Sequence, residues 1–179
     1  MKKEVIVSQL DKENYLKIRE NINRFLTKSA QTFDKKGILI LDIAPQIHVG
    51  AKGFFKKSTI STFDIDPTSK ATYTGDITKY NKILPDNFFD IIVCTEVLEH
   101  TLDPFGAIKE IFRTLKPAGI LLLSTPFNFR IHGPLPDCWR FTTHGLKVLL
   151  TNFSSIKINE LATVERDLMP LHYTVIAKK

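Results

Sequence analysis

The chain has 179 residues, of which 43% are hydrophobic and 25% charged, which excludes a coiled coil, a collagen and an intrinsically disordered chain. The length predicts one domain, and no run of 18 apolar residues predicts a membrane span. Two cysteines, Cys94 and Cys138, are too few for a disulfide framework and favour a reduced, cytoplasmic setting.

The net charge of +6 is concentrated near the N-terminus. Residues 1–36 hold nine basic and five acidic residues, so they contribute +4 of that total. A solvated, basic, helical N-terminal extension over 1–36 explains this charge without a nucleic-acid partner. The first residues also lack the long apolar stretch of a secretory signal, and we expect none.

Strands and helices alternate along the predicted chain. A helix is expected from Asp11 to about Thr32, followed by a strand at 38–41 whose unbroken apolar run is typical of burial on both faces. The alternation predicts an α/β sheet covered by helices on both sides. Further strands are expected at 58–63, 71–74, 89–94, 120–124, 155–161 and 173–177, and further helices at 95–100, 104–115 and 143–150.

Polar side chains follow the first four predicted strands. Asp42, Asp64 and Asp76 each follow a strand, and Thr95-Glu96 follows the fourth. In such folds ligands bind beyond the carboxyl ends of the strands, so these residues predict a ligand site. Each Asp alone would equally suit a helix cap or a turn.

The first turn indicates which ligand class this site takes. Asp64 lies 22 residues after Asp42, where α/β nucleotide folds place a carboxylate on the ribose hydroxyls. The turn itself lacks the G-x-G-x-x-G pattern that wraps a pyrophosphate, and Pro45 has no N–H to donate. S-adenosylmethionine carries no phosphate, so it fits acidic strand ends better than a dinucleotide does.

At these residues the sequence resembles the class I S-adenosylmethionine-dependent methyltransferases, of the type 11 or type 23 kind. The resemblance covers about residues 36–179 and is strongest in ILILDIAP, TFDIDP, ATYTGDIT and LPDNFFDIIVCTEVLEHTLDPFGAIKEIFRTLKPAGILLLSTPF. It implies a Rossmann-like fold with a seven-stranded, mostly parallel sheet and helices on both faces, as a single domain over 1–179. HGPLPDCWRFTTHGL, in an expected substrate-side segment at 126–150, resembles a motif of methyltransferases encoded beside surface-glycan genes.

The resemblance also implies which residues contact the methyl donor. In this family the first turn is rich in glycine, whereas here it reads Ala44-Pro45-Gln46, which leaves open how the methionine end is held. The implied contacts are Asp42 and Ala44 at the methionine end, Asp64 on the ribose, Ile65, Asp76 and Ile77 around the adenine, and Thr95 and Glu96 on the pocket floor.

A hydroxyl acceptor needs a base or a metal to remove its proton. We take His100, His132 and Asp137 as the catalytic candidates. Glu96, Glu99 and His100 would share one face if they lie on a helix. This E-x-x-E-H pattern resembles a divalent-metal site of ubiquinone-type O-methyltransferases and small-RNA methyltransferases, for Mg²⁺ or Mn²⁺, but it also occurs in relatives that need no metal.

The expected function is S-adenosylmethionine-dependent methyl transfer to a small-molecule or glycan acceptor, at a hydroxyl. Two alternatives stay open. One is an RNA 2′-O-methyltransferase with a divalent metal, and the other is a non-catalytic binding protein that has kept the fold. The fold itself selects neither the acceptor nor the oligomeric state.

Overall fold

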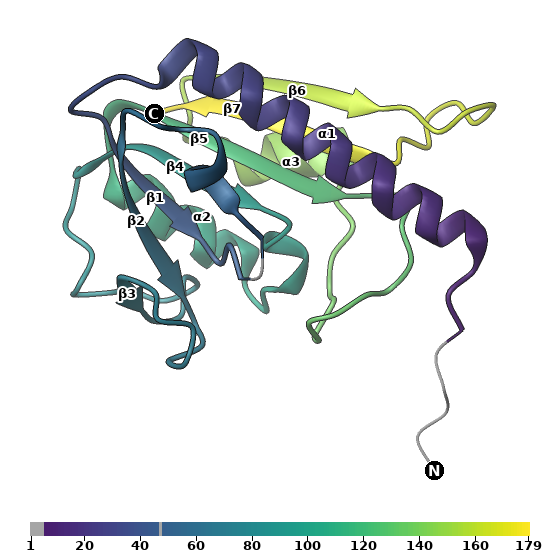
Figure 1. Cartoon of the computed structure of the whole chain (residues 1–179), viewed down its shortest axis with the longest axis horizontal. Coiled ribbons are helices and arrows are strands. Elements are labelled where there is room, and N and C mark those ends of the chain that lie inside the picture. The colour runs from purple at the N-terminus through teal and green to yellow at the C-terminus, as the bar shows by residue number, and fades with distance from the viewer. Residues whose placement is uncertain (1–5, 47) are drawn as a thin grey trace.

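A seven-stranded sheet forms the centre of the molecule in the computed structural model, which describes residues 6–46 and 48–179 (Figure 1). Residues 1–5 of the expected N-terminal extension therefore lie outside the described chain. The strands are β1 (Leu39–Ile43), β2 (Thr59–Asp64), β3 (Tyr73–Thr74), β4 (Phe89–Thr95), β5 (Leu115–Pro126), β6 (Ser155–Leu161) and β7 (His172–Lys178). The α-helices are α1 (Gln9–Phe33), α2 (Pro104–Thr114) and α3 (Thr143–Leu149), and short 3₁₀ turns span Gly50–Gly53 (η1) and Leu98–His100 (η2).

The strand order is β3-β2-β1-β4-β5-β7-β6. β1 to β5 run parallel, and β7 is antiparallel to both of its neighbours, β5 and β6. The order reverses between β1 and β4, which makes their carboxyl ends the topological switch point where α/β sheets bind ligands. The predicted fold class is confirmed.

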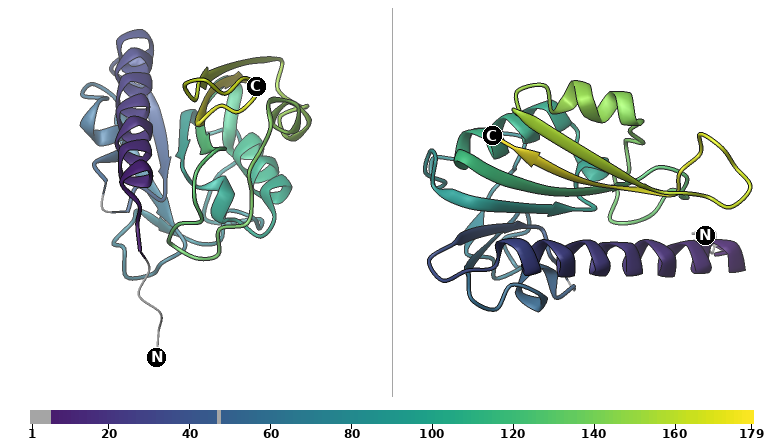
Figure 2. Two further views of the ribbon diagram at one scale, coloured as in Figure 1. Left: turned by 90° about the vertical axis from the view of Figure 1, so that its right-hand side faces the viewer. Right: turned by 90° about the horizontal axis from the view of Figure 1, so that it is seen from above.

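Each strand of the central sheet divides its side chains between two apolar layers. Ile40 and Val93 pack with α1 on one face, whereas Leu41, Ile92 and Leu123 pack with α2 and α3 on the other. Figure 2 shows α1 on one side of the sheet and α2 and α3 on the opposite side. Burial on both faces explains why these strands are unbroken apolar runs rather than alternating ones.

α1 begins earlier than predicted. Ser8 is its N-cap, and its hydroxyl oxygen accepts a hydrogen bond from the backbone N–H of Asp11 at 3.0 Å. Asp11 therefore lies in the first turn instead of starting the helix. Among the described residues no helix is long and apolar enough to cross a membrane.

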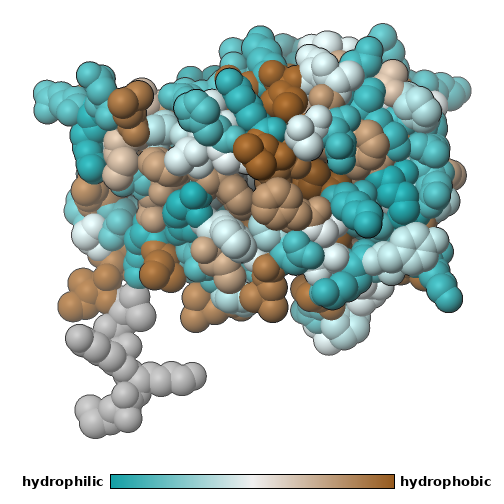
Figure 3. Space-filling view, turned by 180° about the vertical axis from the view of Figure 1, so that it is seen from behind, coloured by the Kyte–Doolittle hydropathy of each residue, from teal (hydrophilic) through white to brown (hydrophobic). Residues whose placement is uncertain are grey.

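The chain after β4 also differs from the prediction. A helix was expected over 95–100, but only the single 3₁₀ turn η2 forms there, because Glu96 takes a left-handed φ of +55° and turns the chain. Seen from behind, apolar side chains lie along the lower edge of the molecule, near the loops (Figure 3). Ile131 and Leu135, on the segment after β5, are among the exposed apolar residues.

Candidate functional site

Two cavities lie at the switch point. The first, the strand-end pocket, has a volume of about 410 Å³ and lies beyond β2, β3 and β4. The second, the helix cavity, has a volume of about 820 Å³ and lies between α1 and the turn after β1. They adjoin each other, since five residues line both: Ala44, Gln46, Glu96, His100 and Pro134.

The turn after β1 keeps a glycine-like backbone although it has lost the glycines. Ala44 has φ +48° and Gln46 has φ +50°, values in the left-handed region that glycine adopts without strain. The turn therefore retains the shape that a glycine-rich loop would have. Both residues line the two cavities, so their side chains occupy space that glycine would leave free.

Asp42 on β1 stabilises the segment that follows this turn. The side chain is buried, and its Oδ2 accepts a hydrogen bond from the N–H of Ala51 at 2.7 Å. A Cβ atom on Gly50 would stand 2.2 Å from the same oxygen, so the close approach requires glycine there. Burial raises the pKa of Asp42 to about 7, against the hydrogen bond that lowers it. Asp42, expected at the methionine end, is not among the lining residues of either cavity.

The strand-end pocket brings together most of the expected donor-binding residues. Asp64 Oδ1 accepts the N–H of Asp66 at 2.9 Å, and Asp76 Oδ1 accepts the N–H and hydroxyl of Thr78 at 2.9 and 2.7 Å. These bonds fix each carboxylate through one oxygen and leave the other for a ligand. Ile65 and Ile77 also line this pocket, whereas Thr95 lines the helix cavity.

Glu96 is held at the junction of the two cavities. Its Oε1 accepts hydrogen bonds from Ser124 Oγ and His172 Nε2, both at 2.8 Å. Burial alone would raise the pKa of Glu96, but the neighbouring imidazole of His172 and these two hydrogen bonds lower it. Glu96 is therefore ionised at neutral pH.

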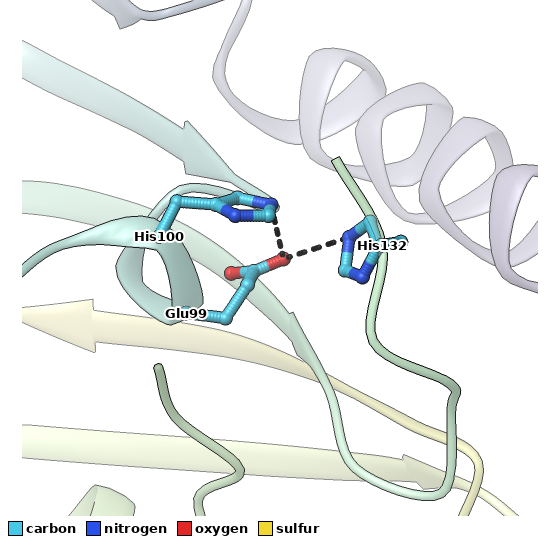
Figure 4. Close-up of side chains that lie close together, drawn as sticks. All are labelled: Glu99, His100 and His132. Carbon is cyan, nitrogen blue, oxygen red and sulfur yellow. Dashed lines mark ion pairs between the residues drawn. The ribbon is translucent and has the colours of Figure 1, made fainter. Parts of the chain in front are cut away.

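Glu99 has the opposite environment. It is fully buried, and among the residues that the structure describes neither carboxylate oxygen has a hydrogen-bond partner. Burial and the nearby charge of Glu96 raise the pKa of Glu99 well above its ordinary value. Its Oε1 lies 3.8 Å from His100 Nε2 and 3.9 Å from His132 Nε2, with both imidazole rings turned toward it (Figure 4). One potential ligand atom from each of the three residues lies within 4.8 Å of the others.

This cluster differs from the set predicted on a helical face. Because the chain forms the η2 turn, Glu96 points to β5 and β7 instead of joining Glu99 and His100. His132, from the segment after β5, takes the third place. A hydrogen bond on the far side of the ring orients His100, whereas Nδ1 of His132 lies near a carboxylate but makes no hydrogen bond within the described residues. His100 Nδ1 lies 3.0 Å from the carbonyl oxygen of Pro136, and His132 Nδ1 lies 3.1 Å from Asp137 Oδ2.

Asp137 lies behind the cavity wall. It forms an ion pair with Arg140 and accepts the N–H of His132 at 2.9 Å. Burial opposes ionisation, but the hydrogen bonds from Arg140 and from the His132 backbone lower the pKa of Asp137 to about 2. Trp139 anchors the same segment, since its indole N–H donates to the Thr101 carbonyl oxygen at 2.8 Å.

Sequence reasoning missed three residues of this site. Arg19 on α1 lines the helix cavity, and Asn21 on α1 reaches His172 on β7. The polar face of the predicted helix appeared to be solvated, so no local pattern distinguished these positions. Only the packing of α1 on the sheet brings them to the site.

The family comparison agrees with this geometry. A family model described as a methyltransferase domain matches residues 10–170. The chain belongs to the methyltransferase-domain family. The resemblance found in the sequence is thereby confirmed, and α1 lies within the matched range except for its first residue.

Individual relatives of this methyltransferase domain match over different lengths. A ubiquinone biosynthesis O-methyltransferase of Haemophilus ducreyi is 49% identical over 37 residues, which cover 21% of this chain and 16% of that protein. Across the curated relatives, the matched segments span only 16% to 39% of their lengths.

Solved structures share the fold over most of the chain. A SAM-dependent methyltransferase from Archaeoglobus fulgidus has a TM-score of 0.66 at 19% identity, covering 90% of this chain and 94% of its own. Phosphoethanolamine N-methyltransferase 2 of Haemonchus contortus, in complex with S-adenosyl-L-methionine, has a TM-score of 0.65 at 17% identity, covering 87% of this chain and 52% of its own.

The left-handed turn leads to a stability prediction. Gln46→Gly should raise the free energy of unfolding by about 0.5–1 kcal/mol, because glycine adopts φ +50° without the strain of a side chain. The matched control, Gln31→Gly, replaces the same exposed residue type inside α1 and should cost about 1 kcal/mol. Urea unfolding measures both. A Gln46→Gly variant as destabilised as the control would contradict a strained turn.

Proposed function

We propose that this chain transfers a methyl group from S-adenosylmethionine to a hydroxyl oxygen of a small-molecule or glycan acceptor. One observation carries the proposal: the strand-end pocket and the helix cavity meet at Glu96 and His100. A donor whose nucleoside fills the first would present its sulfonium methyl group to an acceptor in the second. The segment 126–150, which supplies His132 to the helix cavity, would be the substrate-side segment.

The residues of the strand-end pocket suit this donor. Free carboxylate oxygens of Asp64 and Asp76 would accept hydrogen bonds from ribose hydroxyls and from the adenine amino group. Ile65 and Ile77 would pack against the adenine ring. A nucleoside without phosphate needs no cradle of backbone N–H groups, and the turn with Pro45 offers no such cradle.

The transfer is an in-line displacement. A lone pair of the acceptor oxygen attacks the methyl carbon, the carbon–sulfur bond breaks, and its electron pair stays on sulfur, which becomes a neutral thioether. The acceptor proton goes to Nε2 of His132. The carboxylate of Asp137, whose Oδ2 lies 3.1 Å from Nδ1 without a hydrogen bond in the described chain, would stabilise the positive charge that the ring gains. Holding both reactants in line supplies roughly 7–11 kcal/mol of barrier lowering.

The cluster of Glu99, His100 and His132 favours a metal-assisted version of the same reaction. Within the described residues both oxygens of buried Glu99 lack a hydrogen-bond partner, and one of the two histidines beside it, His100, is oriented by the carbonyl oxygen of Pro136. Such outer partners are typical of metal-binding histidines. One carboxylate and two imidazoles suit Mn²⁺, Co²⁺ or Zn²⁺ better than Mg²⁺. A metal held by Glu99, His100 and His132 would acidify the acceptor hydroxyl.

Donor binding can be tested without knowing the acceptor. S-adenosylhomocysteine should bind the wild-type chain in calorimetry, and Asp64→Ala should weaken it at least tenfold, because the ribose loses its acceptor. Asp66→Ala is the matched control, since Asp66 is exposed and lies outside the strand-end pocket. No binding by the wild type would favour the non-catalytic alternative. Equal affinity in Asp64→Ala would contradict the ribose assignment.

The base can be tested by substitution. His132→Gln should lower kcat by about 10²–10⁴-fold while the affinity for S-adenosylhomocysteine stays within twofold. The assay follows label from methyl-labelled S-adenosylmethionine into a panel of phenols, catechols and sugars, and His144→Gln on α3 is the control. A kcat unaffected by His132→Gln would exclude this residue as the base. Labelling of RNA instead of the panel would favour the RNA alternative.

The metal can be tested by thermal stability. Mn²⁺, Co²⁺ or Zn²⁺ at about 100 times its Kd should add about 2.7 kcal/mol and raise Tm by roughly 5–10 °C. Mg²⁺ should do much less. Glu99→Gln should abolish the shift, whereas Glu165→Gln, an exposed glutamate outside the cluster, should retain it. An identical shift in Glu99→Gln would argue against metal binding at this cluster.

A further inference from the structure

We infer that Glu96 is the counter-ion of the donor's sulfonium, and that Asn21 and His172 are positioning residues that hold its carboxylate in place. The site would then recognise the charge that distinguishes S-adenosylmethionine from its neutral product. This inference rests on the proposed function in taking S-adenosylmethionine as the ligand and in placing its nucleoside in the strand-end pocket.

Three elements meet in one part-buried chain of hydrogen bonds. Asn21 Nδ2 on α1 lies 2.9 Å from His172 Nδ1 on β7, and His172 Nε2 lies 2.8 Å from Glu96 Oε1 after β4. His172 is fully buried. Ser124 on β5 donates to the same glutamate oxygen. In the described part of the chain, Oε2 of Glu96 accepts no hydrogen bond and is left for a ligand.

The direction of these hydrogen bonds indicates whether the His172 ring cancels the negative charge of Glu96. An ionised carboxylate can only accept, so His172 Nε2 must carry the proton that it shares with Glu96. The amide nitrogen of Asn21 donates to Nδ1, which must therefore present a lone pair. This pair of bonds suits the tautomer with its proton on Nε2, and Asn21 would favour that tautomer because a protonated Nδ1 would face its amide hydrogens.

The position of Glu96 matches where the donor charge would lie. Among the described residues, Glu96 is the only carboxylate that lines both the strand-end pocket and the helix cavity. The sulfonium joins the nucleoside to the methyl group that is transferred, so it must lie where the two cavities meet. Asp64 and Asp76 line only the strand-end pocket, on the nucleoside side.

A counter-ion at this point affects turnover as well as binding. After transfer the sulfur is a neutral thioether, and its attraction to Glu96 disappears. The product is then held only by contacts to its nucleoside and amino-acid ends. This change favours exchange of product for a fresh donor.

The test compares two ligands on the same protein. Calorimetry gives Kd for S-adenosylmethionine and for S-adenosylhomocysteine with the wild type and with Glu96→Gln. We expect Glu96→Gln to weaken S-adenosylmethionine about tenfold and to leave S-adenosylhomocysteine within twofold. Equal weakening of both ligands, or none of either, would overturn the counter-ion. If the wild type binds neither nucleoside, the proposed function fails as well, so the two failures are distinguishable.

Variants of His172 and Asn21 show whether these residues position the carboxylate of Glu96 or only fill space. His172→Gln keeps an N–H donor toward Glu96 and should retain most of the preference for S-adenosylmethionine, whereas His172→Leu should lose it about threefold to tenfold. Asn21→Leu should lower the preference for S-adenosylmethionine by a smaller factor than His172→Leu does. Asn14→Leu, which changes an asparagine of α1 that lines neither cavity, should leave the ratio of the two Kd values unchanged.

Nitrogen-15 NMR of labelled histidine provides a readout independent of ligand binding. In the wild type we expect His172 as the neutral tautomer with its proton on Nε2, and in Asn21→Leu a mixture that includes protonated Nδ1. A wild-type His172 that is cationic at pH 7 would overturn the inference, because it would neutralise Glu96. The inference would also be overturned if a folded His172→Leu variant kept the wild-type ratio of the two Kd values.

Discussion

Because helices cover both faces of the central strands, the two cavities lie at the carboxyl ends of these strands. α1 seals one face, and α2 with α3 seals the other. Because the strand order reverses between β1 and β4, the chain segments that follow these two strands turn away from each other and leave a crevice between them. Each polar group that the site can use must therefore lie at a strand end or on a segment folded over it, which is where Asp64, Asp76 and Glu96 lie.

Two glutamates three positions apart show how hydrogen bonding decides charge in this site. Glu96 has donors from β5 and β7, and its pKa is lowered although burial opposes this. Glu99 has none, and its pKa is raised. A satisfied buried carboxylate keeps its charge, whereas an orphaned one becomes neutral or takes a cation. The short segment after β4 thus places the ionised carboxylate of Glu96 near the carboxyl group of Glu99, whose two oxygens have no hydrogen-bond partner in the described chain.

The sequence predicted what depends on local pattern. The run at 38–41 identified a doubly buried strand, and the spacing of Asp42 and Asp64 identified the ends of β1 and β2, although Asp42 supports the turn after β1 instead of lining a cavity. The helical face that would join Glu96 to Glu99 was wrong, because helical spacing does not reveal a residue in the left-handed region. Asn21 and His172 lie 151 positions apart, and no local pattern connects them.

α1 is part of the site rather than an addition to it. Residues 10–36 of the predicted N-terminal extension lie within the family match. The helix there forms one wall of the helix cavity and supplies Asn21, which contacts His172. Its burial is secured by Ile18, Ile22 and Leu26 against the sheet. Because this apolar face fixes the helix, a shift of α1 would change the shape of the helix cavity and the bond to His172 together. In the proposed enzyme, acceptor fit and the charge that faces the donor would therefore depend on the same packed surface.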